Sequence, residues 1–329
     1  MNTSVVLTTI NEKEKTCIPI LELMCRDQDW DLIVVGDKKT PHMELEHGVF
    51  LSADDQEKLP YKLCKQLPWN CYERKNIGYL YAYHNGADYI VNTDDDNYPI
   101  DGWENMLSFF NVKFGPKVLG KDKFCNPLKY FNNTPHKIWP RGLPLHAQSY
   151  SSVVDSFRYD DIGVVAGLWD GCPDFDALGH VYYDHIDWEF AKDKYIVKHR
   201  DFLSPYNTQN TVIRRDLIPF QMLAVGINRA DDIWAGYVSQ YMMKHLDLEL
   251  MYISPTVYQK RNQHDPVQDF HDEKKVFLDT EDLIEALDYV SSHNKSPFDY
   301  YMDLCYSINY LVPGGFIRNV EAWLQDVQG

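Results

Sequence analysis

Three consecutive acidic residues, Asp94, Asp95 and Asp96, follow directly on an apolar segment and constrain this chain more than any other feature. Residues 88–93 combine aromatic and β-branched side chains, which is typical of a buried strand. Adjacent carboxylates repel one another and raise each other's pKa unless a cation lies among them. Carboxylate oxygens suit Mg²⁺ or Mn²⁺. The pattern predicts a cation site at the end of a strand, with a solvated acidic turn as the simpler alternative.

The segments before this triplet predict a parallel α/β sheet. We expect buried strands at 4–9 and 31–37 and helices at 18–25 and 73–85, followed by the strand at 88–93. The order strand, helix, strand, helix, strand favours parallel pairing. Ligands of such sheets bind beyond the carboxyl ends of the strands, where the triplet lies.

The second half of the chain carries weaker signals. We expect residues 97–144 to be largely irregular, because they are rich in Asn, Pro, Gly and aromatics. The remaining expected elements are strands at 161–168 and 249–253, helical segments at 217–223, 233–245 and 280–293, and a polar loop at 263–275. Thr280 is expected to cap the last helix.

Charge and composition exclude several classes of protein. The 329 residues carry 32 Lys and Arg against 49 Asp and Glu, a net charge of -17 that repels nucleic acid and anionic membranes. No run approaches the roughly 18 apolar residues that a transmembrane helix needs, and the N-terminus does not resemble a signal peptide. Seven cysteines without a CxxC pair indicate reduced thiols. We therefore expect a cytoplasmic enzyme with no nucleic-acid partner and no transmembrane segment.

Arg74, Lys75 and Asn76 open the helix that precedes the acidic strand. The N-terminus of a helix with two cations is a good site for a diphosphate. A local basic cluster is informative in so acidic a chain, although a solvated first turn of the helix explains the same pattern.

Two other charged patterns each have a functional and a structural interpretation. Asp231 and Asp232 precede an apolar helix that contains Trp234, so they either cap the helix or supply a general base for an acceptor hydroxyl. Arg141 lies between Pro140 and Gly142, which suits a bidentate contact with an anion or a plain surface position.

Taken together, these motifs resemble the STELLO glycosyltransferase-like family over about residues 4–275. The motifs that carry the resemblance are residues 34–41, 59–62, 67–70, 74–80, 94–97, 139–142, 205–211 and 231–234. A more distant likeness is to the reversibly glycosylated polypeptides, which are UDP-arabinopyranose mutases. It rests on the triplet, residues 141–142, 167–169, 173–176 and 231–236.

The resemblance implies a GT-A-like α/β fold, Rossmann-like, with a mostly parallel central sheet flanked by helices. It implies a UDP-sugar donor, a glycan or other hydroxyl acceptor, and a Mn²⁺ or Mg²⁺ ion. The implied uridine contacts are Thr8, Thr9, Asn11 and Asp37, and the other implied donor contacts are Arg74, Lys75, Asn76 and Asp95. The implied metal ligands are Asp94 and Asp96, together with a late histidine for which either His264 or His271 stands in, or none does.

Three functions remain open at this point. A glycosyltransferase would use Asp231 or Asp232 on the acceptor hydroxyl. A mutase would let Arg141 accept the sugar transiently. A non-catalytic scaffold would keep the fold alone. We expect residues 1–275 to form the glycosyltransferase domain and 276–329 a short C-terminal helical extension, which covers the sheet, forms a homo-oligomer contact or closes over the acceptor.

Overall fold

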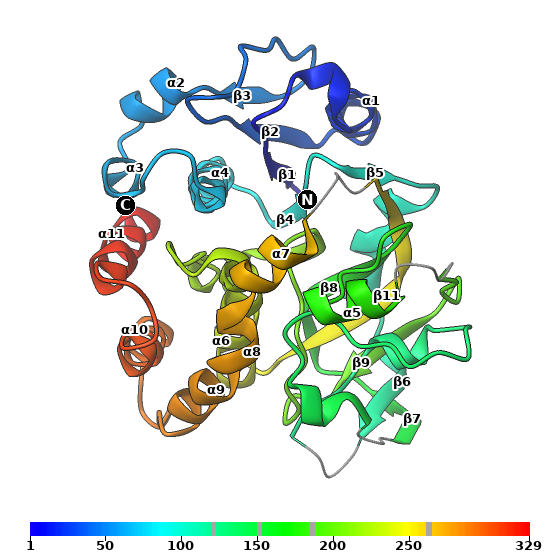
Figure 1. Cartoon of the computed structure of the whole chain (residues 1–329). Coiled ribbons are helices and arrows are strands. Elements are labelled where there is room, and N and C mark those ends of the chain that lie inside the picture. Colours follow the sequence, from blue (N-terminus) through cyan, green and yellow to red (C-terminus); the bar gives the residue numbers. More distant parts are fainter. Residues whose placement is uncertain (120–122, 150–152, 184–187, 261–264) are drawn as a thin grey trace.

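One large sheet organises the protein (Figure 1). The computed structural model describes residues 1–119, 123–149, 153–183, 188–260 and 265–329. The strand order is β3-β2-β1-β4-β10-β8-β11-β9-β6-β7, and β5 pairs with β11 off this path. The strands are β1 (Thr3–Thr8), β2 (Asp31–Val35), β3 (Val49–Leu51), β4 (Tyr89–Thr93), β5 (Asn97–Pro99), β6 (Phe114–Leu119), β7 (Val153–Arg158), β8 (Asp161–Asp170), β9 (Tyr195–Lys198), β10 (Asn210–Arg214) and β11 (Leu248–Gln259).

Helices flank the sheet and line the outside of the molecule. The α-helices are α1 (Ile18–Gln28), α2 (Ala53–Lys58), α3 (Lys62–Gln66), α4 (Lys75–His84), α5 (Ala177–Tyr183), α6 (Asp231–His245), α7 (Pro266–Asp272), α8 (Lys274–Leu278), α9 (Thr280–Asp288), α10 (Pro297–Ile308) and α11 (Phe316–Gln328). Short 3₁₀ helices are η1 (Lys13–Lys15), η2 (Tyr72–Arg74), η3 (Trp103–Asn111), η4 (Leu128–Tyr130), η5 (Leu145–Ser149), η6 (Arg215–Phe220) and η7 (Asn228–Ala230). None of the described helices is both long and apolar enough to span a bilayer.

The N-terminal part is the predicted parallel unit. β1 pairs in parallel with β2 on one side and with β4 on the other, and β2 pairs in parallel with β3. Helix α4 packs on β1 and β2 so closely that a Cβ on Gly78 would lie 2.5 Å from Val6 and 2.8 Å from Val35. This close contact fixes the position of the segment that leads into the acidic triplet.

The rest of the sheet is mixed. β10 runs antiparallel between β4 and β8, and β11 is parallel to β8 but antiparallel to β9. The α/β class with a central sheet flanked by helices is confirmed, with parallel pairing concentrated in its first half. β11 is longer than the predicted strand at 249–253, because it continues past Pro255 after a register shift between Ile253 and Val257.

The prediction of a polar loop at 263–275 was wrong for the described residues, which form α7 and the start of α8. Asp265 accepts a hydrogen bond from the Val267 amide, and Pro266 occupies the first position of α7, so this segment has a complete helix start. Thr280 is also not a cap. It is the first residue of α9, and its hydroxyl accepts a hydrogen bond from the Trp234 indole.

The C-terminal helices pack on the N-terminal half. Asp326 of α11 accepts hydrogen bonds from the backbone amides of Lys62 and Leu63 at the start of α3. The buried indole of Trp323 donates to the carbonyl of Pro219. In Figure 1, α11 lies beside α3, and it also contacts α4, so the C-terminal helix is held against the N-terminal half of the chain.

Candidate functional site

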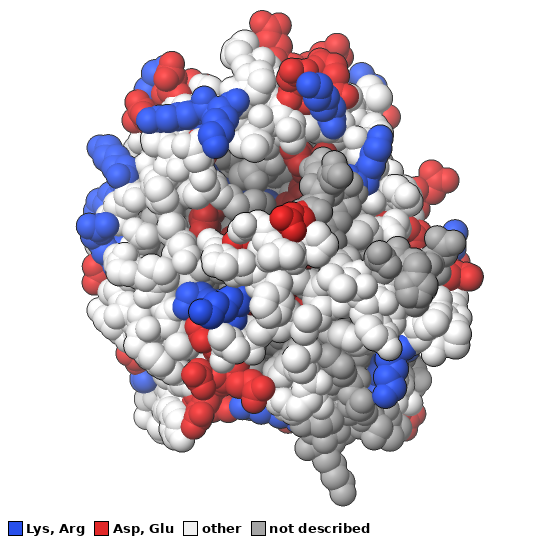
Figure 2. Space-filling model, in the orientation of Figure 1, with Lys and Arg blue, Asp and Glu red and all other residues white. Residues whose placement is uncertain are grey.

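A cavity of about 400 Å³ lies at the carboxyl ends of β1, β2 and β4. On the face shown in Figure 2, acidic side chains lie inside a hollow of the surface. Eight residues that the sequence analysis proposed line the cavity: Thr8, Thr9, Asn11, Asp37, Arg74, Asp94, Asp95 and Asp96. The edge of the sheet thus gathers polar groups that are distant in the sequence, as expected for an α/β fold.

Asp95 is held by the end of β1. Its carboxylate accepts hydrogen bonds from the Thr9 hydroxyl and, at 2.9 Å, from the Asn11 side-chain amide. Both donors line the cavity, and they fix the middle carboxylate of the triplet; their contact with a nucleotide stays a prediction. Asp37 is held similarly, because it accepts hydrogen bonds from the amides of Lys38 and Asn70.

Asp94 is held by two donors on the same oxygen. Its Oδ1 accepts hydrogen bonds from Tyr72 Oη at 2.9 Å and from Lys75 Nζ at 3.0 Å. The Lys75 ammonium also donates to the carbonyls of Thr93 and Thr208 and is 0% exposed. Lys75 therefore lies behind the cavity and compensates Asp94, rather than facing a diphosphate as the sequence analysis expected.

Asp96 is the carboxylate that is least compensated. Its oxygens accept hydrogen bonds from Asn97 at 3.2 Å and from Gln259 at 3.4 Å, both neutral donors. Burial, followed by repulsion from Asp94 and Asp95, raises its pKa to about 7. Three carboxylates face a single buried ammonium, so the surplus of negative charge and the hard oxygen donors fit a divalent cation.

The side-chain groups that could hold a metal ion are known only for the part of the chain that the structure describes. In the ranges that the structure describes, no group of three or more His, Cys, Asp or Glu side chains is arranged to hold a metal ion. His264, the predicted third ligand, lies outside the described residues. Its alternative, His271, lies on α7 with a side chain that is 77% exposed.

Arg74 contributes a buried donor to the cavity. Its guanidinium stacks on Trp69 at 3.5 Å from the ring centroid, Nε donates to Gln56, and Nη1 donates to the carbonyl of Leu67. Nη2 is buried without a hydrogen-bond partner. Asn76 has a structural position instead, because it exchanges two hydrogen bonds with the backbone of Leu223.

A second polar cluster contains the other predicted residues. Arg141 Nε donates to Asp174 at 2.9 Å, while Nη1 and Nη2 donate to the two oxygens of Asp232 at 3.1 Å each. Nη1 also donates to the carbonyl of Arg229. Every guanidinium nitrogen of Arg141 therefore has an acceptor, and the side chain is buried. Arg141 is not a surface arginine.

Asp231 and Asp232 do not cap helix α6, whose N-cap residue is Ala230 without a side-chain cap. The Asp232 carboxylate is bound by Arg141, as described above. Asp231 is buried, and burial together with the nearby charges of Asp232 and Glu73 raises its pKa well above the usual value. Asp232 is therefore compensated by Arg141, whereas its neighbour Asp231 holds a proton more readily than an ordinary carboxylate.

Sequence reasoning missed the residues that connect these groups. Tyr72 Oη lies 2.8 Å from Thr208 Oγ1, and Asn207 donates to Asp174 at 2.7 Å. Asn207 and Thr208 lie in the segment 205–211 and Asp174 in the segment 173–176, which the resemblances had marked without assigning a role. Tyr72 had no such signal, because two of its partners, Asp94 and Thr208, are 22 and 136 residues away in the chain.

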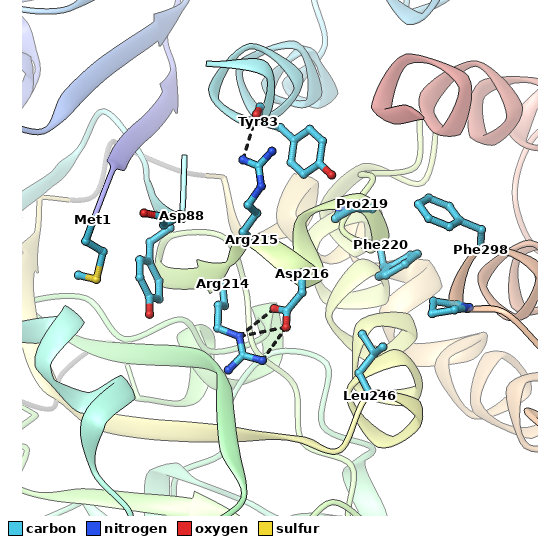
Figure 3. Close-up of a pocket in the computed structure, with 12 residues that line it drawn as sticks. Met1, Tyr83, Asp88, Arg214, Arg215, Asp216, Pro219, Phe220, Leu246 and Phe298 are labelled. Atoms are coloured by element: carbon cyan, nitrogen blue, oxygen red, sulfur yellow. Dashed lines mark hydrogen bonds and ion pairs between the residues drawn. The ribbon is translucent and has the colours of Figure 1, made fainter. Parts of the chain in front are cut away.

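A larger cavity of about 650 Å³ lies near the start of β4, at the opposite end of that strand (Figure 3). Its charged groups bind each other or the backbone. Arg214 forms a bidentate pair with Asp216, Arg215 donates to the carbonyls of Tyr83 and Ala87, and Asp88 accepts from the Asn2 amide. The smaller cavity, with three carboxylates against one buried ammonium, is therefore the candidate functional site.

Comparisons with known proteins agree with the motifs. A family model described as STELLO glycosyltransferases matches residues 229–318. Probable glycosyltransferases STELLO2 and STELLO1 of Arabidopsis thaliana are 27% and 26% identical to this chain over 93% of its length. This chain resembles the STELLO glycosyltransferases. The match runs past residue 275, where the sequence analysis had ended the resemblance.

The similarity has defined limits. The chain spans 42% of the length of each STELLO relative. Among solved structures, S. aureus TarS 1-349 in complex with UDP-GlcNAc matches 99% of this chain and 79% of its own at 10% identity and a TM-score of 0.37. The match to the mannosyltransferase PcManGT from Pyrobaculum calidifontis, in complex with GDP-Man and Mn²⁺, covers 99% of this chain and 86% of PcManGT, at 12% identity and a TM-score of 0.39.

Proposed function

We propose that this protein is a metal-dependent glycosyltransferase that binds a nucleotide sugar, a UDP-sugar by its family resemblance, in the 400 Å³ cavity. The observation that carries the proposal is the acidic triplet at the end of β4, which faces the cavity with a surplus of negative charge. A bound divalent cation would compensate this surplus, and the diphosphate that it carries would lie in the cavity lined by the Arg74 side chain.

Asp94 and Asp96 are the residues that would hold Mn²⁺ or Mg²⁺. When bound, the ion would supply charge compensation for the leaving nucleoside diphosphate. Mg²⁺ sites commonly use one or two carboxylates together with phosphate oxygens, which agrees with two available carboxylates here. Asp95 shapes the wall of the cavity through Thr9 and Asn11. His264 as a further ligand stays a proposal.

On the acceptor side we assign the general base to Asp231. Arg141 binds Asp232 through both oxygens, whereas burial raises the pKa of Asp231, so Asp231 is the carboxylate of the pair that takes up a proton more readily. Asp232 is bound in both oxygens by Arg141 and is a positioning residue in this scheme. Attack by the deprotonated hydroxyl opposite the leaving UDP would invert the anomeric centre.

The mutase alternative receives less support. Transient glycosylation of Arg141 needs a nitrogen that is free to attack the sugar, whereas each nitrogen of this buried guanidinium donates to an acceptor. The division of the chain at residue 275 also stays a proposal, in which the C-terminal helices pack on α3 through α11.

Binding of UDP and of a UDP-sugar panel, by calorimetry with Mn²⁺ or with EDTA, tests the proposal. We expect Mn²⁺-dependent binding in the wild type, its loss in Asp94→Ala/Asp96→Ala, and its retention in Asp54→Ala, which removes an exposed acidic residue of α2. Wild-type protein that binds no nucleotide sugar would refute the proposal and favour the scaffold. Intact mass after incubation with each UDP-sugar detects the self-glycosylation that a mutase requires.

A further inference from the structure

The hydroxyl of Tyr72 joins three groups at the wall of the cavity. It lies 2.9 Å from Asp94 Oδ1, 2.9 Å from Lys75 Nζ and 2.8 Å from Thr208 Oγ1. Tyr72 comes from η2, Lys75 from the start of α4, and Thr208 from the segment before β10. One oxygen atom therefore connects the acidic triplet with two elements that are distant in the sequence.

The proton count fixes the direction of these hydrogen bonds. A tyrosine hydroxyl has one proton to donate and two lone pairs. The Lys75 ammonium is a donor only, and its three protons are shared among four acceptors within reach, of which the Tyr72 hydroxyl is one. The Tyr72 proton goes to the Asp94 carboxylate, which accepts only, and the Thr208 hydroxyl must donate its own proton to Tyr72. The directions of the hydrogen bonds that join Tyr72 to Asp94 and to Thr208 are then determined.

We propose that Tyr72 is a positioning residue for the cation site, which holds Asp94 Oδ1 so that Oδ2 faces the cavity and a divalent cation. The inference deepens the proposed function and rests on it. Lys75 binds the same Oδ1, but it also donates to two backbone carbonyls and lies 5.0 Å from the Tyr72 ring centroid. Tyr72 thus positions both Asp94 and the ammonium that compensates it.

The variant Tyr72→Phe tests this assignment with little disturbance of packing. It keeps the half-buried ring next to Lys75 and removes only the hydroxyl. Lys75 retains Asp94 and two carbonyls as acceptors, so its charge stays compensated. Tyr81→Phe is the matched control, because Tyr81 lies on the neighbouring helix α4 and is also half-buried.

The readout is Mn²⁺ affinity of the full chain by electron paramagnetic resonance, with and without UDP. Loss of a group that orients a metal ligand costs about 10–100-fold in metal affinity, so we expect Tyr72→Phe to bind Mn²⁺ about tenfold more weakly. Tyr81→Phe should match the wild type. A change of less than about twofold in a folded Tyr72→Phe would overturn the inference.

Two outcomes separate this inference from the proposed function. If the wild type binds Mn²⁺ and Tyr72→Phe binds it equally well, only the role of Tyr72 fails. If the wild type binds no Mn²⁺ in either condition, the proposed cation site and this inference fail together. Should Tyr72→Phe not fold, Thr208→Val removes one hydrogen bond to the same oxygen and should weaken Mn²⁺ binding about two- to fivefold, and an unchanged affinity would count against the role of Tyr72.

Discussion

Replacing Arg141 with Met should strongly destabilise the fold, because Arg141 compensates two buried carboxylates. The substitution keeps a side chain of comparable length but removes the donors to Asp174 and Asp232. Asp174 retains a hydrogen bond from Asn207, whereas Asp232 retains only the amide of Ile233. Removing one partner of a buried ion pair costs about 3–5 kcal/mol, and we expect this substitution to fall in that range.

The cost should also depend on pH. Burial opposes ionisation of Asp174, but Arg141, together with Arg229 and Asn207, outweighs burial and lowers its pKa from 3.8 to about 2. In the wild type, the stability from this carboxylate is thus present above about pH 4 and is lost as the pH falls toward 2. Without Arg141, only Arg229 at 4.0 Å and Asn207 oppose burial. The pKa of Asp174 therefore rises, and protonation of Asp174 at low pH removes part of the destabilisation of the variant. The difference in free energy of unfolding between Arg141→Met and the wild type should therefore become smaller as the pH falls.

Urea unfolding followed by tryptophan fluorescence, at about pH 7.5 and about pH 5, measures both effects. The matched control is Arg214→Met, since Arg214 also forms a bidentate pair, but with the exposed Asp216. Exposed pairs contribute about 1 kcal/mol or less. If Arg141→Met loses no more free energy of unfolding than Arg214→Met, or if its loss does not change with pH, then Arg141 does not compensate the two buried carboxylates as inferred.

Two further predictions concern packing and a buried lysine. Gly78→Ala should lower the free energy of unfolding by about 1–3 kcal/mol, because its Cβ would lie 2.5 Å from Val6. The control Gly314→Ala, whose Cβ would have nothing within 4 Å, should lower it by less than about 1 kcal/mol. Equal melting temperatures of the two variants would contradict this prediction. Burial lowers the pKa of Lys198 from 10.5 to about 8, so between these values the unfolded chain binds a proton that the folded chain does not. The free energy of unfolding of the wild type, relative to that of Lys198→Met, should therefore rise from about pH 8 to about pH 10 in urea titrations. A difference between the two proteins that does not change with pH would contradict the lowered pKa of Lys198.

Local signals in the sequence predicted the part of the fold that they determine. β1, β2 and β4 were predicted because each is a short apolar run that ends in polar residues. The triplet was placed correctly at the cavity, since the carboxyl ends of parallel strands meet at one edge. α7 was predicted as a loop because its inward-facing residues are acidic. Asp269 and Glu273 are buried there only because Arg229, about 40 residues earlier in the chain, lies within reach of both.

The same reason explains the errors within the site. Arg74 and Lys75 were identified as a basic pair, but the sequence does not show that Lys75 is enclosed by oxygens from Thr93 and Thr208. Thr9 and Asn11 line the cavity, so their contact with a ligand stays a prediction, but the sequence does not show that they donate to Asp95. Residue types indicated the chemistry, whereas long-range pairing decides which group faces the cavity.

The placement of β10 has a consequence for how the chain folds during synthesis. β4 pairs with β1 on one edge, but its other edge is covered only by β10, which is synthesised more than a hundred residues later. At translation rates of about 5–20 residues per second, this edge stays open on the ribosome for on the order of ten seconds. An uncovered apolar strand edge is a template for association with other chains. The nascent chain should therefore depend on chaperones during that interval, and slower translation between the two strands should increase aggregation.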